Sequence, residues 1–403
     1  MKILIFWEQD FYGGVDTHLL ELLKTWPEKN DQITILTNQE NSAAKKISEE
    51  LLKFVKIEKF CSYSYNIINY KFRKYKIMQY VLYFLNPIFF IINLFFLNRK
   101  INKFKDYDVI LSNNGGYPAS WNCISSIIVA KKIGIQKRFL LIHHESNNFF
   151  PLMKWFNKIV DKLVSESVSS IICVSKATRN SLIKKRFLNL SSKKIKVVHN
   201  SLKIAKVKKK NFFNLKKSYK INKDKLLIGS ISRIEPYKGH SELIKSISKI
   251  DKILLENAHF FLIGKGYDKY ESFLKDEVKR LHLSKKITFT GYIKGKSENL
   301  ISQLDLLINP TQTFEGFGLS ILEAINCKVP VIATNVGAIK EVFGEKIINI
   351  VPPRNKLKMT KKIISFLHRP KTFFRKANLA YNYFSKNYSP MSKKYREIFV
   401  KIN

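Results

Sequence analysis

The sequence is poor in cysteine, and its few cysteines are scattered. The 403 residues contain four of them, Cys61, Cys123, Cys173 and Cys327, with no C-x-x-C pair. This spacing supports neither a disulfide framework nor a cysteine zinc site, and it is typical of a protein of the reducing cytosol. The first residues run directly into an apolar strand without the pattern of a signal peptide, so we expect a cytoplasmic protein.

Acidic residues are also scarce, and arginine is much rarer than lysine. Against 72 Lys and Arg stand 31 Asp and Glu, which gives a formal net charge of +41. An excess of this size points to an anionic partner, either nucleic acid or a membrane surface. Only 11 of the 72 basic residues are Arg, the side chain that binds bases and phosphates through two parallel hydrogen bonds. We therefore expect no nucleic acid partner, but attraction to acidic surfaces.

Apolar residues are abundant, at 45% of the chain, and they recur in short runs followed by helical stretches. Ten runs predict strands: Ile3–Trp7, Ile33–Thr37, Val109–Ser112, Phe139–Ile142, Ile171–Val174, Leu227–Ser230, His259–Ile263, Ile287–Phe289, Leu306–Asn309 and Pro330–Ala333. These strands are continuously apolar rather than alternating, which is typical of parallel sheets covered on both faces by helices. The fold class is therefore α/β, with one parallel sheet in each half of the chain.

The chain is too long for one ordinary core, because domains cluster at roughly 100–200 residues. Residues 184–225 contain sixteen Lys or Arg and one acid, Asp224, which is too polar for a shared core. We place the domain junction there, with an N-terminal domain at 1–200 and a C-terminal domain at 201–370. Residues 371–403 carry no strand signal, and we expect a helical segment that packs back toward the N-terminal domain.

One apolar run, residues 77–97, is long enough for a transmembrane helix and carries no charge. Predicted strands on both sides of it belong to one sheet, and Pro87 with Asn86 interrupts it. We favour a broken helical hairpin in the membrane interface, with a buried helix pair and a membrane span as alternatives. The aromatic residues suited to the interface are Tyr80, Tyr83, Phe84, Phe89, Phe90, Phe95 and Phe96. The flanking basic residues are Lys71, Arg73, Lys74, Lys76, Arg99, Lys100 and Lys103.

Two windows contain residues that suit a phosphate and sugar site. In Asn309–Glu323, a strand is followed by Glu315, a Gly-Phe-Gly turn and a helix that begins near Gly318. Free N–H groups at a helix N-terminus attract phosphate, and glycine lets the backbone approach it. Glu323, in the second turn of that helix, suits hydrogen bonding to a diol such as a ribose.

The second window, Ile231–His240, also lies between a strand and a helix. Its two basic residues, Arg233 and Lys238, follow the carboxyl end of the strand. Ligands of open parallel sheets bind at this edge, so we expect the pair to hold a diphosphate.

Together these windows resemble the retaining GT-B glycosyltransferases of family GT4. The matching elements lie in order across residues 226–353: Arg233 with Lys238-Gly239, Phe261–Gly266, Phe289–Tyr292, Glu315–Gly318 with Glu323, and Val329–Ile332. The two glutamates eight positions apart are the most specific of these elements. In the first half, Gly13-Gly14 after the first strand and Ile171–Ser181 are similar to the same family.

The resemblance implies two Rossmann-like domains with parallel sheets facing a central cleft, and a nucleotide-sugar donor held mainly by the C-terminal domain. It implies that Arg233 and Lys238 bind the diphosphate, that Glu323 binds the ribose, and that Glu315 contacts the donor sugar. Further donor-binding residues implied by it are Gly13, Gly14, Tyr292, Gly316, Phe317, Gly318 and Leu319.

The other catalytic candidates are His143 and His144, which directly follow the strand Phe139–Ile142. In the family a His at this place contacts the donor sugar. We prefer His143 by strand length and keep His144 open. Family members need no metal, because Arg, Lys and the helix dipole offset the charge of the leaving group. We therefore expect no metal and no cofactor, with the nucleotide-sugar as a substrate.

The function implied is transfer of a sugar from a nucleoside-diphosphate donor to a hydroxyl group with retention of configuration. We expect a lipid-linked or cell-envelope glycan acceptor, of capsule, O-antigen or lipopolysaccharide type. The enzyme is expected to be peripheral on the inner face of the cytoplasmic membrane, bound through residues 77–97. A nucleotide-sugar epimerase, another GT-B enzyme and a non-catalytic glycan-binding protein are the alternatives.

Overall fold

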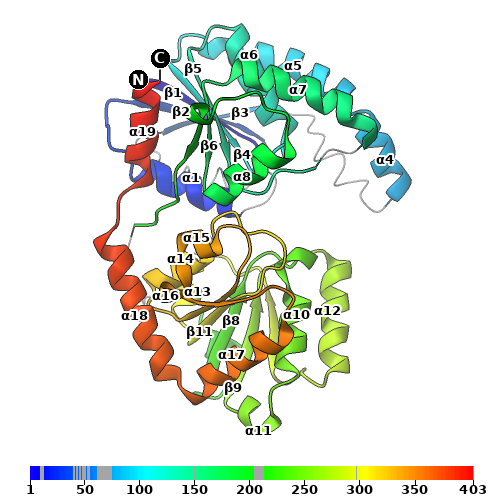
Figure 1. Ribbon diagram of the computed structural model, residues 1–403, viewed down its shortest axis with the longest axis vertical. Coiled ribbons are helices and arrows are strands. Elements are labelled where there is room, and N and C mark those ends of the chain that lie inside the picture. Colours follow the sequence, from blue (N-terminus) through cyan, green and yellow to red (C-terminus); the bar gives the residue numbers. More distant parts are fainter. Residues whose placement is uncertain are drawn as a thin grey trace. The chain divides into compact units, whose positions relative to one another are not determined.

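The computed structural model describes residues 1–9, 13–39, 41, 44, 47, 51, 55–60, 75–148, 151–203, 213–295 and 297–402. The chain forms two compact units (Figure 1). The first contains Met1–Ser201 together with Ser389–Asn403, and the second contains Leu202–Tyr388. The junction between them lies beside the boundary expected at residue 200.

The first unit is built on a seven-stranded sheet in the order β3-β2-β1-β4-β5-β6-β7, and all neighbouring strands are parallel. The strands are β1 (Lys2–Trp7), β2 (Gln32–Asn38), β3 (Val55–Phe60), β4 (Val109–Asn114), β5 (Lys137–Ile142), β6 (Ser170–Cys173) and β7 (Ile195–Val197). Its helices are α1 (Gly14–Lys24), α4 (Lys76–Phe84), α5 (Asn86–Ile101), α6 (Trp121–Lys132), α7 (Lys154–Ser167), α8 (Lys176–Lys185) and α19 (Met391–Lys401). Central strands are buried from end to end, because helices cover both faces of the sheet.

The second unit is built on a six-stranded parallel sheet in the order β10-β9-β8-β11-β12-β13. The strands are β8 (Leu226–Ile231), β9 (Ala258–Ile263), β10 (Ile287–Gly291), β11 (Leu306–Asn309), β12 (Val331–Thr334) and β13 (Asn349–Val351). Its helices are α9 (Leu215–Ser218), α10 (His240–Ile247), α11 (Lys252–Leu255), α12 (Asp268–Arg280), α13 (Ser297–Ile301), α14 (Leu319–Asn326), α15 (Ile339–Val342), α16 (Gly344–Ile347), α17 (Lys356–His368) and α18 (Pro370–Lys386).

All ten predicted strands are present, with ends that differ by about two residues at most. Three strands were missed, and they are β3, β7 and β13. Each lies at the edge of its sheet. Strand β3 has the sequence VKIEKF, in which charges interrupt the apolar pattern, and the other two are only three residues long. Edge strands are short and charged in many proteins, because this prevents pairing with other chains, and the same properties hide them from a hydrophobicity search.

The apolar run 77–97 is broken as predicted, but it forms two successive helices joined at Leu85, which has helical backbone angles, rather than a hairpin. Helix α4 ends at Phe84 and α5 begins at Asn86, with Pro87 in its first turn. One face of α5, which includes Phe90 and Leu97, belongs to the core of the first unit. No helix within the described ranges has both the length and the apolar character needed to cross a bilayer.

The set of interfacial aromatic residues requires a correction. Phe90 is only 3% exposed and packs edge-on against Trp121 and Phe156, so it is a core residue. Tyr83 and Phe96 are partly buried against the same core. The sequence could not separate these residues from exposed ones, because α5 is apolar on both of its faces. Among the flanking basic residues, Lys71, Arg73 and Lys74 lie outside the described residues.

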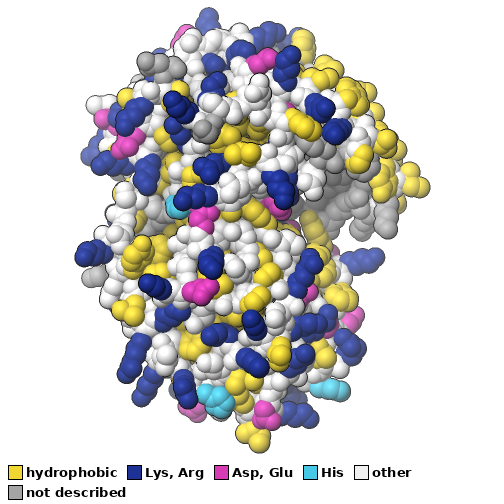
Figure 2. All heavy atoms as spheres, in the orientation of Figure 1, with side chains coloured by type: hydrophobic (Ala, Val, Ile, Leu, Met, Phe, Trp, Pro, Cys, Tyr) yellow, Lys and Arg dark blue, Asp and Glu magenta, His cyan; other side chains and the backbone are white. Residues whose placement is uncertain are grey.

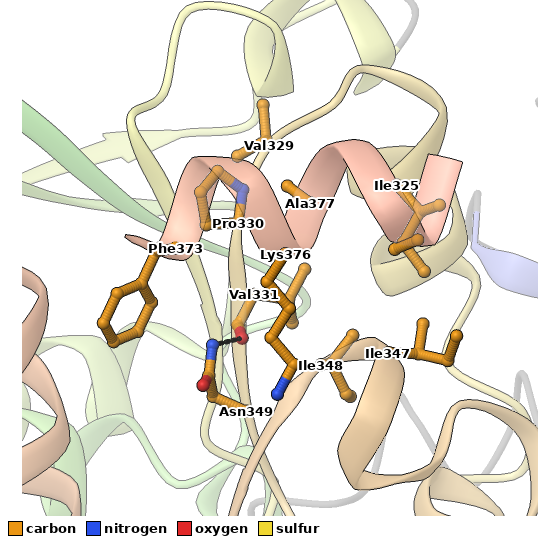
Figure 3. A pocket seen from close by; sticks show the side chains of 11 residues that line it. Ile325, Val329, Pro330, Val331, Ile347, Ile348, Asn349, Phe373, Lys376 and Ala377 are labelled. Carbon is orange, nitrogen blue, oxygen red and sulfur yellow. Dashed lines mark hydrogen bonds between the residues drawn. The ribbon is translucent and has the colours of Figure 1, made fainter. Parts of the chain in front are cut away.

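The last 33 residues, expected as one helical segment, are divided between the two units. Helix α18 belongs to the second unit, where Phe373, Lys376 and Ala377 face the start of β12 (Figure 3). Helix α19 belongs to the first unit. There its Phe399 stacks on Phe139 of β5 with ring centroids 4.7 Å apart, and Arg396 donates a 2.9 Å hydrogen bond to Asp31.

Candidate active site

The site in the second unit lies where the strand order reverses. Strand β8 is the first of this sheet along the chain, with β9 on one side and β11 on the other. Loops that leave neighbouring strands at such a point diverge to opposite faces and open a crevice between them. The two sequence windows are the loops that follow β8 and β11, so the sheet topology brings them together.

An ion pair connects the two loops. The Nζ atom of Lys238 donates a hydrogen bond of 2.9 Å to Oε2 of Glu315, and both side chains are only 14% exposed. Thr311 Oγ1 lies 3.3 Å from the same carboxylate oxygen and donates to Asn309 Oδ1 at 2.8 Å. Burial alone would lower the pKa of Lys238, but Glu315 and Tyr237 raise it above its ordinary value. Lys238 is therefore a charged group in a poorly hydrated place.

Two glycines allow this close approach of the loops. Gly239 has a φ of +78°, and a Cβ atom at this position would lie 1.9 Å from the carbonyl oxygen of Pro310. Gly337 has a φ of +57°, and its Cβ would lie 2.2 Å from the carbonyl oxygen of Glu315. The same carbonyl accepts a 2.9 Å hydrogen bond from the N–H of Ala338. The backbone around Glu315 is thus held by residues that follow β12.

The second predicted diphosphate ligand, Arg233, lies on the same loop as Lys238 but is more exposed, at 56% of its side chain. Its guanidinium forms a 2.9 Å ion pair with Glu235 and donates a 3.2 Å hydrogen bond to the hydroxyl of Tyr237. The charge of Arg233 lowers the pKa of Lys238, an effect smaller than that of Glu315, so the two cations repel each other. A dianionic phosphate group between them would remove this repulsion.

Helix α14 begins at the turn that follows Glu315. Gly318 caps it with a φ of +93°, and Leu319 is its first residue. Phe317 and Glu323 are buried, and Gly316 lies between Glu315 and Phe317. Tyr292 follows β10, an outer strand of the sheet, and is 59% exposed. The structure therefore gathers the Lys238 and Glu315 loops and the α14 N-terminus, while Tyr292 stands apart from them at the sheet edge.

The first unit carries the histidine pair at the carboxyl end of β5. Nε2 of His143 lies 2.7 Å from Oδ1 of Asn113 on the neighbouring strand β4, whose register partner on β5 is Leu141. Burial, with a smaller effect of His144, lowers the pKa of His143 to about 3, so the ring is neutral. His144 is half-buried. Gly13 precedes α1, and Gly14 is the first residue of that helix.

Sequence reasoning missed several residues that support the site. His18 of α1 packs edge-on against His143, with ring centroids 4.6 Å apart. Asn113 and Thr311 hold His143 and Glu315 through the contacts given above. A usable signal was present for both, because each is a polar residue within two positions of the end of a strand. Within the described residues, no three His, Cys, Asp or Glu side chains are grouped as a metal ion would require.

Comparison with protein families matches both halves of the chain. Residues 12–206 match the family described as Glycosyltransferase Family 4, and residues 211–383 match Glycosyl transferases group 1. The two matched segments meet near the junction of the two structural units.

Individual relatives agree with this result. An O-antigen biosynthesis glycosyltransferase of Escherichia coli is 30% identical over 132 residues, which is 33% of this chain and 35% of that protein. The chain thus matches about a third of the length of this relative. An uncharacterized glycosyltransferase of Methanocaldococcus jannaschii is 23% identical over 343 residues, which is 82% of this chain and 79% of that protein.

Solved structures of similar proteins share the fold over nearly the whole chain. The Anabaena protein HepE in complex with UDP and glucose has a TM-score of 0.77 at 18% identity, with 99% of each chain covered. A glycosyltransferase of Rickettsia africae has a TM-score of 0.74 at 21% identity and covers 100% of this chain and 98% of its own. The fold is therefore GT-B, and the chain belongs to the group 1 glycosyltransferases with a family 4 N-terminal region.

Proposed function

We propose that this protein transfers a sugar from a nucleoside-diphosphate sugar to a hydroxyl of a lipid-linked or cell-envelope glycan, with retention of configuration. The observation that carries the proposal is the ion pair of Lys238 and Glu315, each with a side chain only 14% exposed, beside the N-terminus of α14. This arrangement offers a cation and helix N–H groups to a diphosphate, and a carboxylate to the hydroxyls of the attached sugar. The Anabaena neighbour bound to UDP-glucose supports this class of donor.

The proposed reaction needs stabilisation of separated charge. As the bond between the anomeric carbon and the phosphate oxygen breaks, the ring gains positive and the diphosphate negative charge. Lys238, Arg233 and the α14 N-terminus would favour that state over the intact donor. The acceptor oxygen bonds to the anomeric carbon on the same face, and its proton passes to the departing phosphate. No metal is assigned a role in this step.

The remaining predicted residues keep their proposed roles. Glu323 would bind the ribose, Tyr292 would lie near the base, and Glu315 with the backbone of Phe317 and Gly318 would contact the sugar. His143 is neutral and donates its N–H to Asn113, so Nδ1 would accept a hydrogen bond from a sugar hydroxyl.

A membrane-bound acceptor is supported by the outer face of α4 and α5. Exposed apolar residues recur along α5 at Ile88, Ile91, Ile92 and Phe95, and the helix ends in Arg99 and Lys100. Neighbouring helix α7 adds Trp155, which is 57% exposed. Figure 2 shows hydrophobic side chains gathered over this part of the first unit, with Lys and Arg beside them. Apolar insertion and attraction to anionic lipid would act together there.

A donor screen tests the proposal. The full chain would be heated with UDP, GDP, ADP and CDP in turn, and we expect one of them to raise the melting temperature of the second unit. A ligand at 100 times its Kd adds roughly 2.7 kcal/mol of stability. The matching nucleotide sugar, mixed with extracted envelope lipids, should then release the nucleotide and glycosylate the lipid. Epimerised donor without transfer would show an epimerase, and no nucleotide binding would contradict the proposal.

A further inference from the structure

We propose that Tyr395 of the C-terminal helix α19 is a positioning residue for His143, and that it acts through His18 of helix α1. The inference rests on the proposed function, in which His143 faces the donor sugar. All three residues belong to the first unit, although the whole second unit separates Tyr395 from the other two along the chain.

The three side chains form a continuous row inside the first unit. Tyr395 and His18 are both fully buried, and the Tyr395 hydroxyl lies 3.3 Å from Nε2 of His18. The His18 ring also meets the His143 ring edge-on, with an interplanar angle of 76°. A row of this kind transmits a displacement, because close-packed rings leave no space in which to adjust separately.

The protons of the row can be assigned. Burial raises the pKa of Tyr395 well above its ordinary value, so its hydroxyl keeps the proton. Burial, and then the neighbouring His143, lower the pKa of His18, so this ring is neutral and has one N–H and one acceptor nitrogen. The phenol is the better donor and imidazole the better acceptor. With Tyr395 as the donor to Nε2, the proton of His18 is on Nδ1.

The hydrogen bond from Tyr395 is the one that holds the His18 ring. Among the described residues, Nδ1 of His18 has no hydrogen-bond partner, so rotation of the ring is restrained at Nε2. His143 in turn is held by Asn113 at Nε2 and by the His18 ring at its side. Loss of the Tyr395 hydroxyl would remove this restraint on the His18 ring, and the change would reach His143 through the ring contact while the hydrogen bond of His143 to Asn113 remains.

Nuclear magnetic resonance of the full chain with 15N-labelled histidine rings measures the tautomer of His18 and the environment of the His143 ring. Tyr395→Phe removes only the hydroxyl. We expect the His18 signals to change from the Nδ1–H form to a mixture of tautomers, and the ring signals of His143 to shift with them. The control Tyr383→Phe, at an exposed position of α18, should shift neither. Identical His143 signals in wild type and Tyr395→Phe would overturn the inference.

Kinetics with the donor found by the screen give the second readout. Tyr395→Phe should lower kcat by roughly fivefold or more and leave the donor KM within about twofold. In a His143→Ala background the same change should have no further effect on kcat, because the residue acts through His143. An equal loss in both backgrounds would show a structural role only. If Tyr395→Phe does not fold, His18→Gln, which accepts the hydrogen bond, should keep more activity than His18→Leu.

The ring signals and the kinetics distinguish a failure of this inference from a failure of the proposed function. A protein that transfers no sugar from any donor would contradict the proposed function. The ring signals would still show whether Tyr395 positions His143.

Discussion

At the scale of single residues, the second unit holds two opposite charges together where a diphosphate is expected. Lys238 and Glu315 form an ion pair at 2.9 Å. Removal of one partner from a buried pair is costly, because the other charge stays in a poorly hydrated place. The pair therefore stabilises the contact between the two loops, and it also keeps a charged Lys238 at the place where the diphosphate is expected.

For Lys238→Ala we expect weaker nucleotide binding and a lower melting temperature of the second unit. A hydrogen bond between charged groups contributes roughly 1.5–3 kcal/mol, so the Kd for the donor nucleotide should rise by about tenfold to a hundredfold. Calorimetry measures the Kd, with Lys279→Ala on the exposed face of α12 as the matched control. Equal affinity in Lys238→Ala and wild type would remove Lys238 from the donor site.

The two glutamates should differ in their effects. Glu323→Ala should weaken binding of the nucleotide itself, since this residue is proposed to bind the ribose. Glu315→Gln should leave nucleotide affinity unchanged and lower turnover, because its amide oxygen still accepts from Lys238 but carries no charge toward the sugar. Calorimetry and initial rates together separate these cases. Wild-type turnover in Glu315→Gln would show that the carboxylate does not act on the sugar.

At the scale of elements, loops from β8, β11 and β12 meet backbone to backbone, and glycine allows this. Gly239→Ala should separate the first two loops, because the added Cβ would overlap the Pro310 carbonyl. Gly344→Ala is the matched control, since its φ of +65° is similar but nothing lies within 4 Å of the new atom. The control should cost about 1–2 kcal/mol of unfolding free energy.

Gly239→Ala should cost more than its control and abolish nucleotide binding. Denaturant unfolding and calorimetry provide the two measurements. A loss of stability equal to that of Gly344→Ala, with nucleotide binding intact, would show that the loops adapt.

One face of helix α5 packs into the core of the first unit, and its other face is apolar and exposed to solvent. The change of Ile88, Ile91, Ile92 and Phe95 to Ser should release the protein from vesicles that contain anionic phosphatidylglycerol. Each of these side chains is more than half exposed, so the fold and nucleotide binding should persist. Ile253→Ser, at an 81% exposed position of α11, is the control. Salt should weaken vesicle binding of the wild type without abolishing it.

Vesicle sedimentation checks this prediction. Undiminished binding of the four-serine variant would show that another surface meets the membrane. Loss of the fold would show that the outer face of α5 contributes to the core after all.

At the scale of the whole molecule, the chain leaves the first unit at Ser201 and returns to it with α19. Phe399 of this helix is 1% exposed and packs against Trp26 as well as Phe139. Phe399→Ala should lower the unfolding free energy of the first unit by about 3–5 kcal/mol. Val400→Ala, at the exposed next position, should change it by less than about 0.5 kcal/mol. Equal effects of the two changes would show that α19 is a loosely held appendage.

The sequence by itself determined the α/β class, the ten apolar strands and the two windows of the second unit. These features depend on neighbours along the chain. A buried strand is a continuous apolar run, and a loop that binds phosphate places its glycines and charges within a few positions. The break at Pro87 also depends only on neighbouring residues, because the proline ring disrupts the turn of helix that contains it.

Only the tertiary structure decided which residues far apart in the chain act together. Lys238 meets Glu315 across 77 positions, and Tyr395 meets His18 across 377. It also decided that Phe90 is core while Phe95 on the same helix is exposed. Composition cannot distinguish two apolar faces of one helix, since burial depends on which face another element covers. The edge strands β3, β7 and β13 were missed for the same reason, because pairing with a neighbouring strand, rather than an apolar run of their own, makes them strands.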